Sequence, residues 1–373
     1  MAESGEAPEV LAEAVGVTVD VLDSWVSGAD EPTAGEWTKL ARHLKRPKSA
    51  FLLPRPPSSS LPPDLRTAAG WGSRELGPDE RLQLRRAGRL QRYLAQLIAE
   101  EGGGTALLPT AGLGDEPDDV ARVLRSWLQV SNSEQRGWSS PSVGFTAWRS
   151  ALERRGVLVL TLRLGADGVR GFSLTHDVAP MIAVNSAETI EARTFTLMHE
   201  LAHLASRSQA ACGPPLGNYT DGGKHERWCD RVAAAVLLPQ GAVLGQLALL
   251  GTERDATIED LQLAREVAKR FRTSLRAAAL RLVDLGLAPG SLYGAVEKVA
   301  RGGDRQKRSG GPPGGRPAAV QRLGELGPRT AQVLLDGLDR NRLTERDARN
   351  LLRLDGQELD ELRHLTRASA SGG

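Results

Sequence analysis

The chain has 373 residues, 40% of them hydrophobic, and a formal net charge of +2, so it is long enough for more than one domain with a sizeable core. The near-neutral charge excludes a global electrostatic argument for nucleic-acid binding, and only two cysteines, Cys212 and Cys229, argue against a disulfide-stapled secreted fold. The N-terminus is acidic, and no apolar run reaches the roughly 18 residues of a membrane span. We therefore expect a soluble, cytoplasmic protein without a membrane partner.

Residues 1–53 are expected to form a small domain of three short helices, at Pro8–Val15, Val19–Val26 and Ala34–Leu44. Thr33 is well placed to cap the third helix, because its hydroxyl can accept a hydrogen bond from the first turn. The order of the glycine, tryptophan and leucine positions in this segment resembles a Cro-like helix-turn-helix.

The charge of this segment argues against DNA binding. Residues 1–44 carry two basic side chains, Lys39 and Arg42, against nine acidic ones: Glu3, Glu6, Glu9, Glu13, Asp20, Asp23, Asp30, Glu31 and Glu36. The second helix, which would enter the DNA groove, contains Asp20 and Asp23, whereas phosphates attract the opposite charge. We interpret residues 8–53 as a helix-turn-helix-like fold that has lost DNA binding, with a protein contact or packing role as the alternative.

Residues 54–78 are expected to be a linker, because five prolines occur between positions 54 and 63. A helical segment, residues 79–145, follows, with an amphipathic helix at Asp79–Glu100 and another helix at Asp118–Leu128. One face of the first helix carries five arginines. No aromatic residue interleaves with them to stack on bases, so we interpret this face as solvated.

Three strands and three helices are expected between about residues 146 and 250. A helix at Phe145–Arg155 is followed by apolar, β-branched runs at Val157–Leu162, Val169–Leu174 and Met181–Val184, separated by Gly, Asp and Pro turns. The third run leads directly into a helix that contains His199. This order predicts an α+β fold that is mainly helical and has a small antiparallel or mixed sheet.

The His199 helix carries a His-Glu-x-x-His motif. On a helix, residues four positions apart lie on one face, so His199 and His203 can both bind one metal ion. Glu200 is about 100° around the helix, from where its carboxylate can reach a water molecule beside that metal. This pattern predicts a zincin-like metallopeptidase core over residues 146–250 with one Zn²⁺ per chain.

A third ligand is expected on a second helix, which runs to Leu238 and stops at Pro239. Glu226 on that helix would complete a two-His, one-Glu site and leave a coordination position for water. Asp230, one turn further, would accept the spare N–H of a ligating imidazole. His225 is a less favoured substitute for Glu226, and the three-His variant of the motif is absent.

The remaining chain shows no chemical motif. Residues 251–297 are expected to be a helical tail of the core, and residues 298–317 a flexible linker rich in Gly, Pro, Lys and Arg. Residues 318–373 are expected to be a small module of short helices, at Ala318–Leu326, Thr330–Leu338 and Glu345–Leu352.

Taken together, residues 194–204 and 226–239 resemble the ImmA/IrrE family of bacterial zinc metallopeptidases, and the chain is similar over residues 8–290 to members with an N-terminal helix-turn-helix. The resemblance implies metal ligands at His199, His203 and Glu226 and a catalytic base at Glu200. This chain departs from the family pattern with Cys229-Asp230 in place of Ala-Asn, and with Val232 in place of Phe. An aspartate at position 230 keeps a hydrogen-bond acceptor there.

The resemblance implies a zinc-dependent endopeptidase that cleaves a regulatory protein, commonly a transcriptional repressor, in a stress-response or mobile-element switch. Tyr219 and His225 are the candidate donors to the oxyanion of the reaction. The alternative is a metal-containing regulatory or sensor protein that acts by partner or DNA binding with little or no proteolysis. The sequence assigns no oligomeric state.

Overall fold

The computed structural model describes residues 7–45, 51, 66–67, 77–165, 169–206, 222–251, 261–303 and 316–371. The chain divides into two compact units. The first comprises residues up to Arg89 together with Leu164–Val169, and the second comprises Leu90–Arg163 with residues from Arg170 onward. The linker expected at residues 54–78 lies almost entirely outside the described residues.

The first unit begins with three helices, α1 (Pro8–Val15), α2 (Val19–Ser27) and α3 (Ala34–His43). Leu11, Ala12 and Leu22 are its buried core. The capping expected at Thr33 is present: its hydroxyl accepts from the Glu36 backbone N–H, and the Glu36 carboxylate accepts from the Thr33 backbone N–H at 2.8 Å. The two-residue strand β1 (Arg66–Thr67) and the start of α4 (Pro78–Glu100) complete the described part of this unit.

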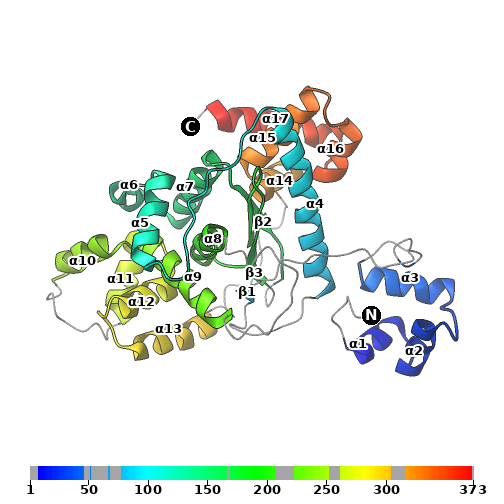
Figure 1. Ribbon diagram of the computed structural model, residues 1–373, viewed down its shortest axis with the longest axis horizontal. Helices are drawn as coiled ribbons and strands as arrows, with labels where there is room; N and C mark the ends of the chain where they lie inside the picture. Colours follow the sequence, from blue (N-terminus) through cyan, green and yellow to red (C-terminus); the bar gives the residue numbers. More distant parts are fainter. Residues whose placement is uncertain are drawn as a thin grey trace. The chain divides into compact units, whose positions relative to one another are not determined.

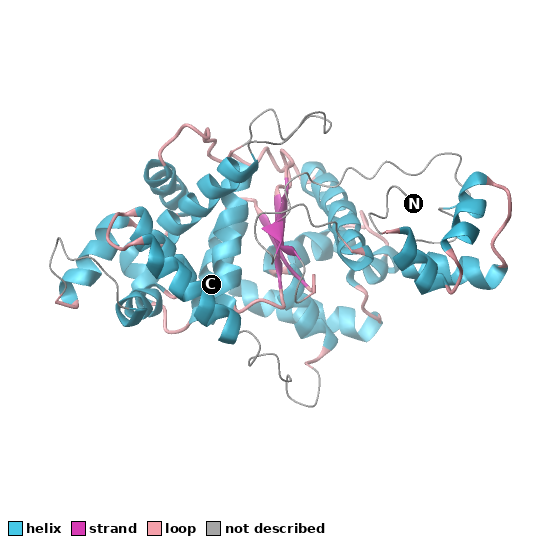
Figure 2. Cartoon of the chain, turned by 90° about the horizontal axis from the view of Figure 1, so that it is seen from below, coloured by secondary structure: helices cyan, strands magenta, loops and turns pink. Residues whose placement is uncertain are grey.

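The second unit contains a small mixed sheet. Its strands are β2 (Leu158–Leu162), β3 (Val169–Leu174) and β4 (Met181–Asn185). Strand β4 lies between the other two and pairs parallel with β2, with Leu158 opposite Met181, and antiparallel with β3, with Leu174 opposite Met181. All five residues of β4 are buried, because helices cover the strand; Figure 2 shows the strands as a narrow magenta band among helices.

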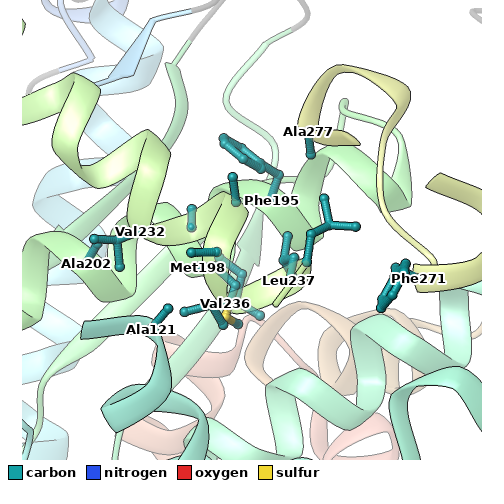
Figure 3. Close-up of a cluster of buried hydrophobic side chains, with 14 of the residues drawn as sticks. Ala121, Phe195, Met198, Ala202, Val232, Val236, Leu237, Phe271 and Ala277 are labelled. Carbon is teal, nitrogen blue, oxygen red and sulfur yellow. The ribbon is translucent and has the colours of Figure 1, made fainter. Parts of the chain in front are cut away.

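Besides the Leu90–Glu100 part of α4, nine helices of this unit precede the C-terminal segment among the described residues. They are α5 (Pro117–Leu128), α6 (Asn132–Gly137), α7 (Pro141–Arg154), α8 (Ile190–Ala205), α9 (Gly222–Leu237), α10 (Gln240–Leu249), α11 (Leu261–Phe271), α12 (Leu275–Asp284) and α13 (Gly290–Gly303). Helix α8 packs on β4, α7 and α9, and α9 also packs on α5 and α12 (Figure 1). The shared core includes Met198 and Ala202 of α8 and Val232 and Val236 of α9 (Figure 3).

The last four helices belong to the same unit. They are α14 (Ala318–Leu326), α15 (Pro328–Asp339), α16 (Glu345–Leu352) and α17 (Gly356–Ser371). Helices α14 and α15 contact β2, so this segment packs directly on the sheet (Figure 1).

Mainly helical structure with a small mixed sheet confirms the α+β fold class and fits a zincin-like core. Helices α6, α10 and α17 were not expected from the sequence, and α13 continues to Gly303, into the range expected as a linker. Among the described residues, no single helix combines the length and apolarity needed to cross a bilayer.

Candidate metal centre

Helix α8 lies in the hydrophobic core and has buried polar side chains as well as apolar ones. The hydroxyl of Thr189 caps its first turn by accepting from the Ala192 backbone N–H at 3.3 Å. From Thr194 to Ala202 every residue is buried, including His199 and Glu200, which are 0% and 1% exposed. Burying an imidazole and a carboxylate costs free energy unless each has partners, so their neighbours decide what this helix can do.

Helix α9 supplies the facing groups. The Nε2 atoms of His199 and His203 lie 3.0 Å apart. The two carboxylate oxygens of Glu226 lie 3.2 Å from His199 Nε2 and 3.1 Å from His203 Nε2. The structure therefore brings the three residues expected as ligands to one point, two from α8 and one from α9.

This donor set fits a metal ion such as zinc. Two imidazole nitrogens and a carboxylate facing one point present only negative charge and lone pairs, which a cation between them would satisfy. A tetrahedral zinc ion with bonds of roughly 2.0–2.1 Å would separate its ligand atoms by about 3.3 Å. The three separations found here, 3.0, 3.1 and 3.2 Å, lie close to that value.

Asp230 fixes the orientation of the His199 ring. Its carboxylate oxygen Oδ1 lies 2.9 Å from His199 Nδ1. A carboxylate at this distance accepts the Nδ1–H and so leaves the lone pair on Nε2, the atom that faces His203 and Glu226. This is the position expected for Asp230 from the sequence, one helical turn after Glu226.

The charge of Glu226 is stabilised by the two imidazoles. Burial by itself raises the pKa of this carboxyl, but when the imidazoles of His199 and His203 are protonated at Nε2, their hydrogen bonds and positive charge act in the opposite direction and dominate. The net result is a Glu226 pKa well below its ordinary value. This direction favours the ionised carboxylate, which is the form that binds a metal.

Glu200 lies against strand β3, beside Gly171. Only a glycine fits at that position of the strand. A Cβ placed on Gly171 would be 2.5 Å from Thr196 Cγ2 and 2.9 Å from the Ala183 carbonyl oxygen, and 3.4 Å from Glu200 Oε1. Strand β3 therefore approaches α8 closely beside the Glu200 carboxylate. Sequence reasoning missed Gly171, because a single glycine within a strand pattern signals close backbone approach without naming the neighbour.

The second candidate oxyanion donor, His225, lies beside the ligands. Its Nε2 is 2.8 Å from Ser206 Oγ, and its ring centroid is 4.9 Å from that of His203. Tyr219 and Cys212 lie outside the described residues.

A second set of potential ligands overlaps the first. His203, His225 and Cys229 also bring one ligand atom each within 4.8 Å of one another. Because this set shares His203 with the expected one, the two sets compete for its imidazole unless the ring bridges two ions. Cys229 is fully buried one turn along α9 from Glu226, a position that the sequence treated as an ordinary thiol.

Comparison with known families agrees with this geometry. The model of the Peptidase_M78 family, described as IrrE N-terminal-like domain, matches residues 152–283. This range contains β2 to β4, α8 and α9 and indicates a metallopeptidase-type domain, whereas residues 7–45 and α14–α17 lie outside it. No curated protein and no solved structure matches the chain significantly.

Proposed function

We propose that this chain is a zinc-dependent endopeptidase of the ImmA/IrrE type, joined to an N-terminal helix-turn-helix-like domain. The observation that carries the proposal is the convergence of His199, His203 and Glu226 at one point, with Glu200 on the same helix. The match to a metallopeptidase-type family over residues 152–283 supports it.

In the proposed site, His199 Nε2, His203 Nε2 and the Glu226 carboxylate would hold one zinc ion. When bound, zinc would polarise the scissile carbonyl and lower the pKa of a coordinated water molecule from about 15.7 to near 7. Asp230 would keep His199 in the tautomer that presents Nε2 to the ion.

Glu200 is proposed to move the proton. Hydrolysis adds water across the C–N bond, so one proton must leave the attacking oxygen and one must reach the departing nitrogen. A carboxylate can accept the first proton and donate it to the amine. Burial of Glu200 among apolar residues of α8 keeps bulk water from competing for that proton. His225 and Tyr219 remain candidate donors to the oxyanion.

The substrate is proposed to be a regulatory protein, such as a transcriptional repressor. The N-terminal helical unit supports a regulatory role, because a small domain of this kind is suited to contact another protein, while its acidic charge makes DNA the less favoured partner. The proposed setting is a bacterial stress-response or mobile-element switch in the cytoplasm.

The test compares the wild type with Glu200→Gln and with Glu191→Gln, which makes the same chemical change in the first turn of α8. Each protein is purified, its zinc is quantified, and it is incubated with lysate of the source organism for terminal-peptide mass spectrometry. We expect about one zinc in all three and new protein termini with the wild type and Glu191→Gln. We expect Glu200→Gln to cleave about 10²- to 10⁴-fold more slowly.

Cleavage by Glu200→Gln at the wild-type rate would contradict the role of Glu200. Zinc in all three proteins with no cleavage by any would favour the alternative, a metal-containing regulatory or sensor protein that binds partners without proteolysis. Absence of bound metal from all three would contradict the site itself.

A further inference from the structure

A cavity of about 790 Å³ opens in the second unit, outside the candidate metal centre. One wall is formed by the end of α7 and by Gly156 and Leu158, which lead into β2. The beginning of α15 and Thr366 of α17 form another part of the lining. The volume lies in the range of about 300–1,000 Å³ that is typical of small-molecule sites. The cavity is therefore lined both by residues that the family model matches and by the C-terminal helices.

Three arginines line this cavity: Arg154, Arg155 and Arg329. Among the described residues, no carboxylate lies within ion-pair distance of any of their guanidinium groups. The carboxylate that also lines the cavity, Glu153, is already paired with Arg149 at 3.1 Å and accepts from the Arg329 backbone N–H at 3.2 Å. Glu153 attracts Arg329 electrostatically, but among the described residues the lining still carries three guanidinium groups against one carboxylate.

An aromatic ring lies beside this charge. Trp127 of α5 lines the cavity, is half-buried, and has the Arg155 guanidinium 6.0 Å from its ring centroid. A flat ring next to a guanidinium offers a stacking surface for a planar heterocycle. Guanidinium groups also bind phosphate oxygens through paired, charge-assisted hydrogen bonds. The two features together select a ligand that has both a planar group and phosphates.

We propose that this cavity binds a nucleoside phosphate, with Arg154 and Arg329 holding the phosphates and the base stacked near Trp127. The site is independent of the metal centre and of the peptidase proposal. Because its lining comes both from α7 and β2 and from α15 and α17, a bound nucleotide would hold the C-terminal helices on the sheet.

The experiment measures binding to the full-length protein by isothermal titration calorimetry at constant ionic strength. The probes are adenosine triphosphate, guanosine triphosphate and inorganic pyrophosphate. The variants are Arg154→Gln, Arg329→Gln and Trp127→Leu. Arg122→Gln on α5, an exposed arginine outside the lining, is the matched control. Circular dichroism melting checks that each variant is folded.

We expect saturable binding of a nucleoside triphosphate at one site per chain, and a rise in the melting temperature of the wild type. Arg154→Gln and Arg329→Gln should each weaken binding of the nucleotide about tenfold. Trp127→Leu should weaken binding of the nucleotides but not of pyrophosphate. Arg122→Gln should change the binding of neither. If Trp127→Leu does not fold, Arg155→Gln replaces it as the test of the stacking side.

Two results would overturn the proposal. One is no saturable binding of any probe up to about 5 mM, which corresponds to less than about 3 kcal/mol of binding free energy. The other is equal loss of binding in Arg122→Gln and in the cavity variants, which indicates non-specific charge attraction. Pyrophosphate binding as tight as nucleotide binding, unchanged in Trp127→Leu, would overturn the nucleoside assignment.

Discussion

His199 has both of its ring nitrogens engaged: Nδ1 faces Asp230, and Nε2 faces His203 and Glu226. A side chain held at both ends has a defined tautomer and little rotational freedom, so its lone pair is pre-oriented for a metal. Glu226 brings a carboxylate, with a pKa below its ordinary value, to the same point. At the scale of single residues, these contacts place the ligand atoms in an arrangement that suits a metal ion.

Asp230→Ala should weaken zinc binding by about 10- to 100-fold, because the imidazole of His199 loses the acceptor that fixes its tautomer. Competition with a chromophoric chelator measures the affinity. Asp119→Asn, an exposed carboxylate of α5 paired with Arg122, is the control and should bind zinc as the wild type does. Equal affinity in Asp230→Ala and the wild type would show that Asp230 does not orient the ligand.

The two overlapping ligand sets predict opposite effects of Glu226→Ala and Cys229→Ala on zinc binding. If His199, His203 and Glu226 hold the ion, Glu226→Ala should lose most of the bound zinc, whereas Cys229→Ala should keep it, because its thiol is not needed. Metal content by atomic emission after dialysis distinguishes the two. Loss of zinc in Cys229→Ala with retention in Glu226→Ala would assign the ion to His203, His225 and Cys229 instead.

At the scale of elements, a buried ion pair fastens the C-terminal helices to the core. Arg149 of α7 pairs with Glu153 and donates to the carbonyl oxygens of Gly324 at the end of α14 and of Val159 in β2. Burial lowers the pKa of Arg149 and raises that of Glu153, and the opposite charge of the partner offsets part of each shift. Gly327 lies so close to both side chains that a Cβ there would clash with them.

Glu153→Gln should destabilise the protein by about 3–5 kcal/mol, because it leaves the Arg149 charge buried without its counter-ion. Urea unfolding, with the free energy taken from the midpoint and slope, measures this. Asp119→Asn, which breaks an exposed pair on α5, should change stability by less than about 1 kcal/mol. A loss no larger in Glu153→Gln than in this control would show that the pair does not hold the helices.

At the scale of the whole molecule, the acidic segment of residues 1–44 should not bind duplex DNA. Of its two basic side chains within residues 1–44, Lys39 already donates to the Val15 carbonyl oxygen at 3.0 Å. Helix α2 presents Asp20 and Asp23. Repulsion of these carboxylates by phosphates opposes the counter-ion release on which DNA binding depends.

Fluorescence anisotropy with labelled duplex DNA tests this on the full chain. We expect the wild type to bind more weakly than the non-specific range of about 10⁻⁴–10⁻⁶ M at physiological salt, and Asp20→Lys/Asp23→Lys to gain salt-dependent affinity. Tight, salt-dependent binding by the wild type would contradict the charge argument and favour a role in DNA binding.

The sequence by itself determined the local features of this protein. The three strands, the cap at Thr33 and the spacing of His199 and His203 follow from period, turn chemistry and helix geometry, all of which act over a few residues. The position of Glu226 and Asp230 on one face of a helix follows from an equally local spacing. These expectations needed no knowledge of what the helices pack against.

Only the tertiary structure decided which distant groups meet. The approach of Gly171 to Glu200, the second ligand set through Cys229, and the contact of α14 and α15 with β2 join residues far apart in sequence. The sequence predicted the C-terminal helices as a separate module. Arg149 and Glu153, which anchor them, have the spacing of an ordinary i, i+4 pair on a helix surface. Their burial is a property of the packed core, and long-range packing leaves no local pattern in the chain.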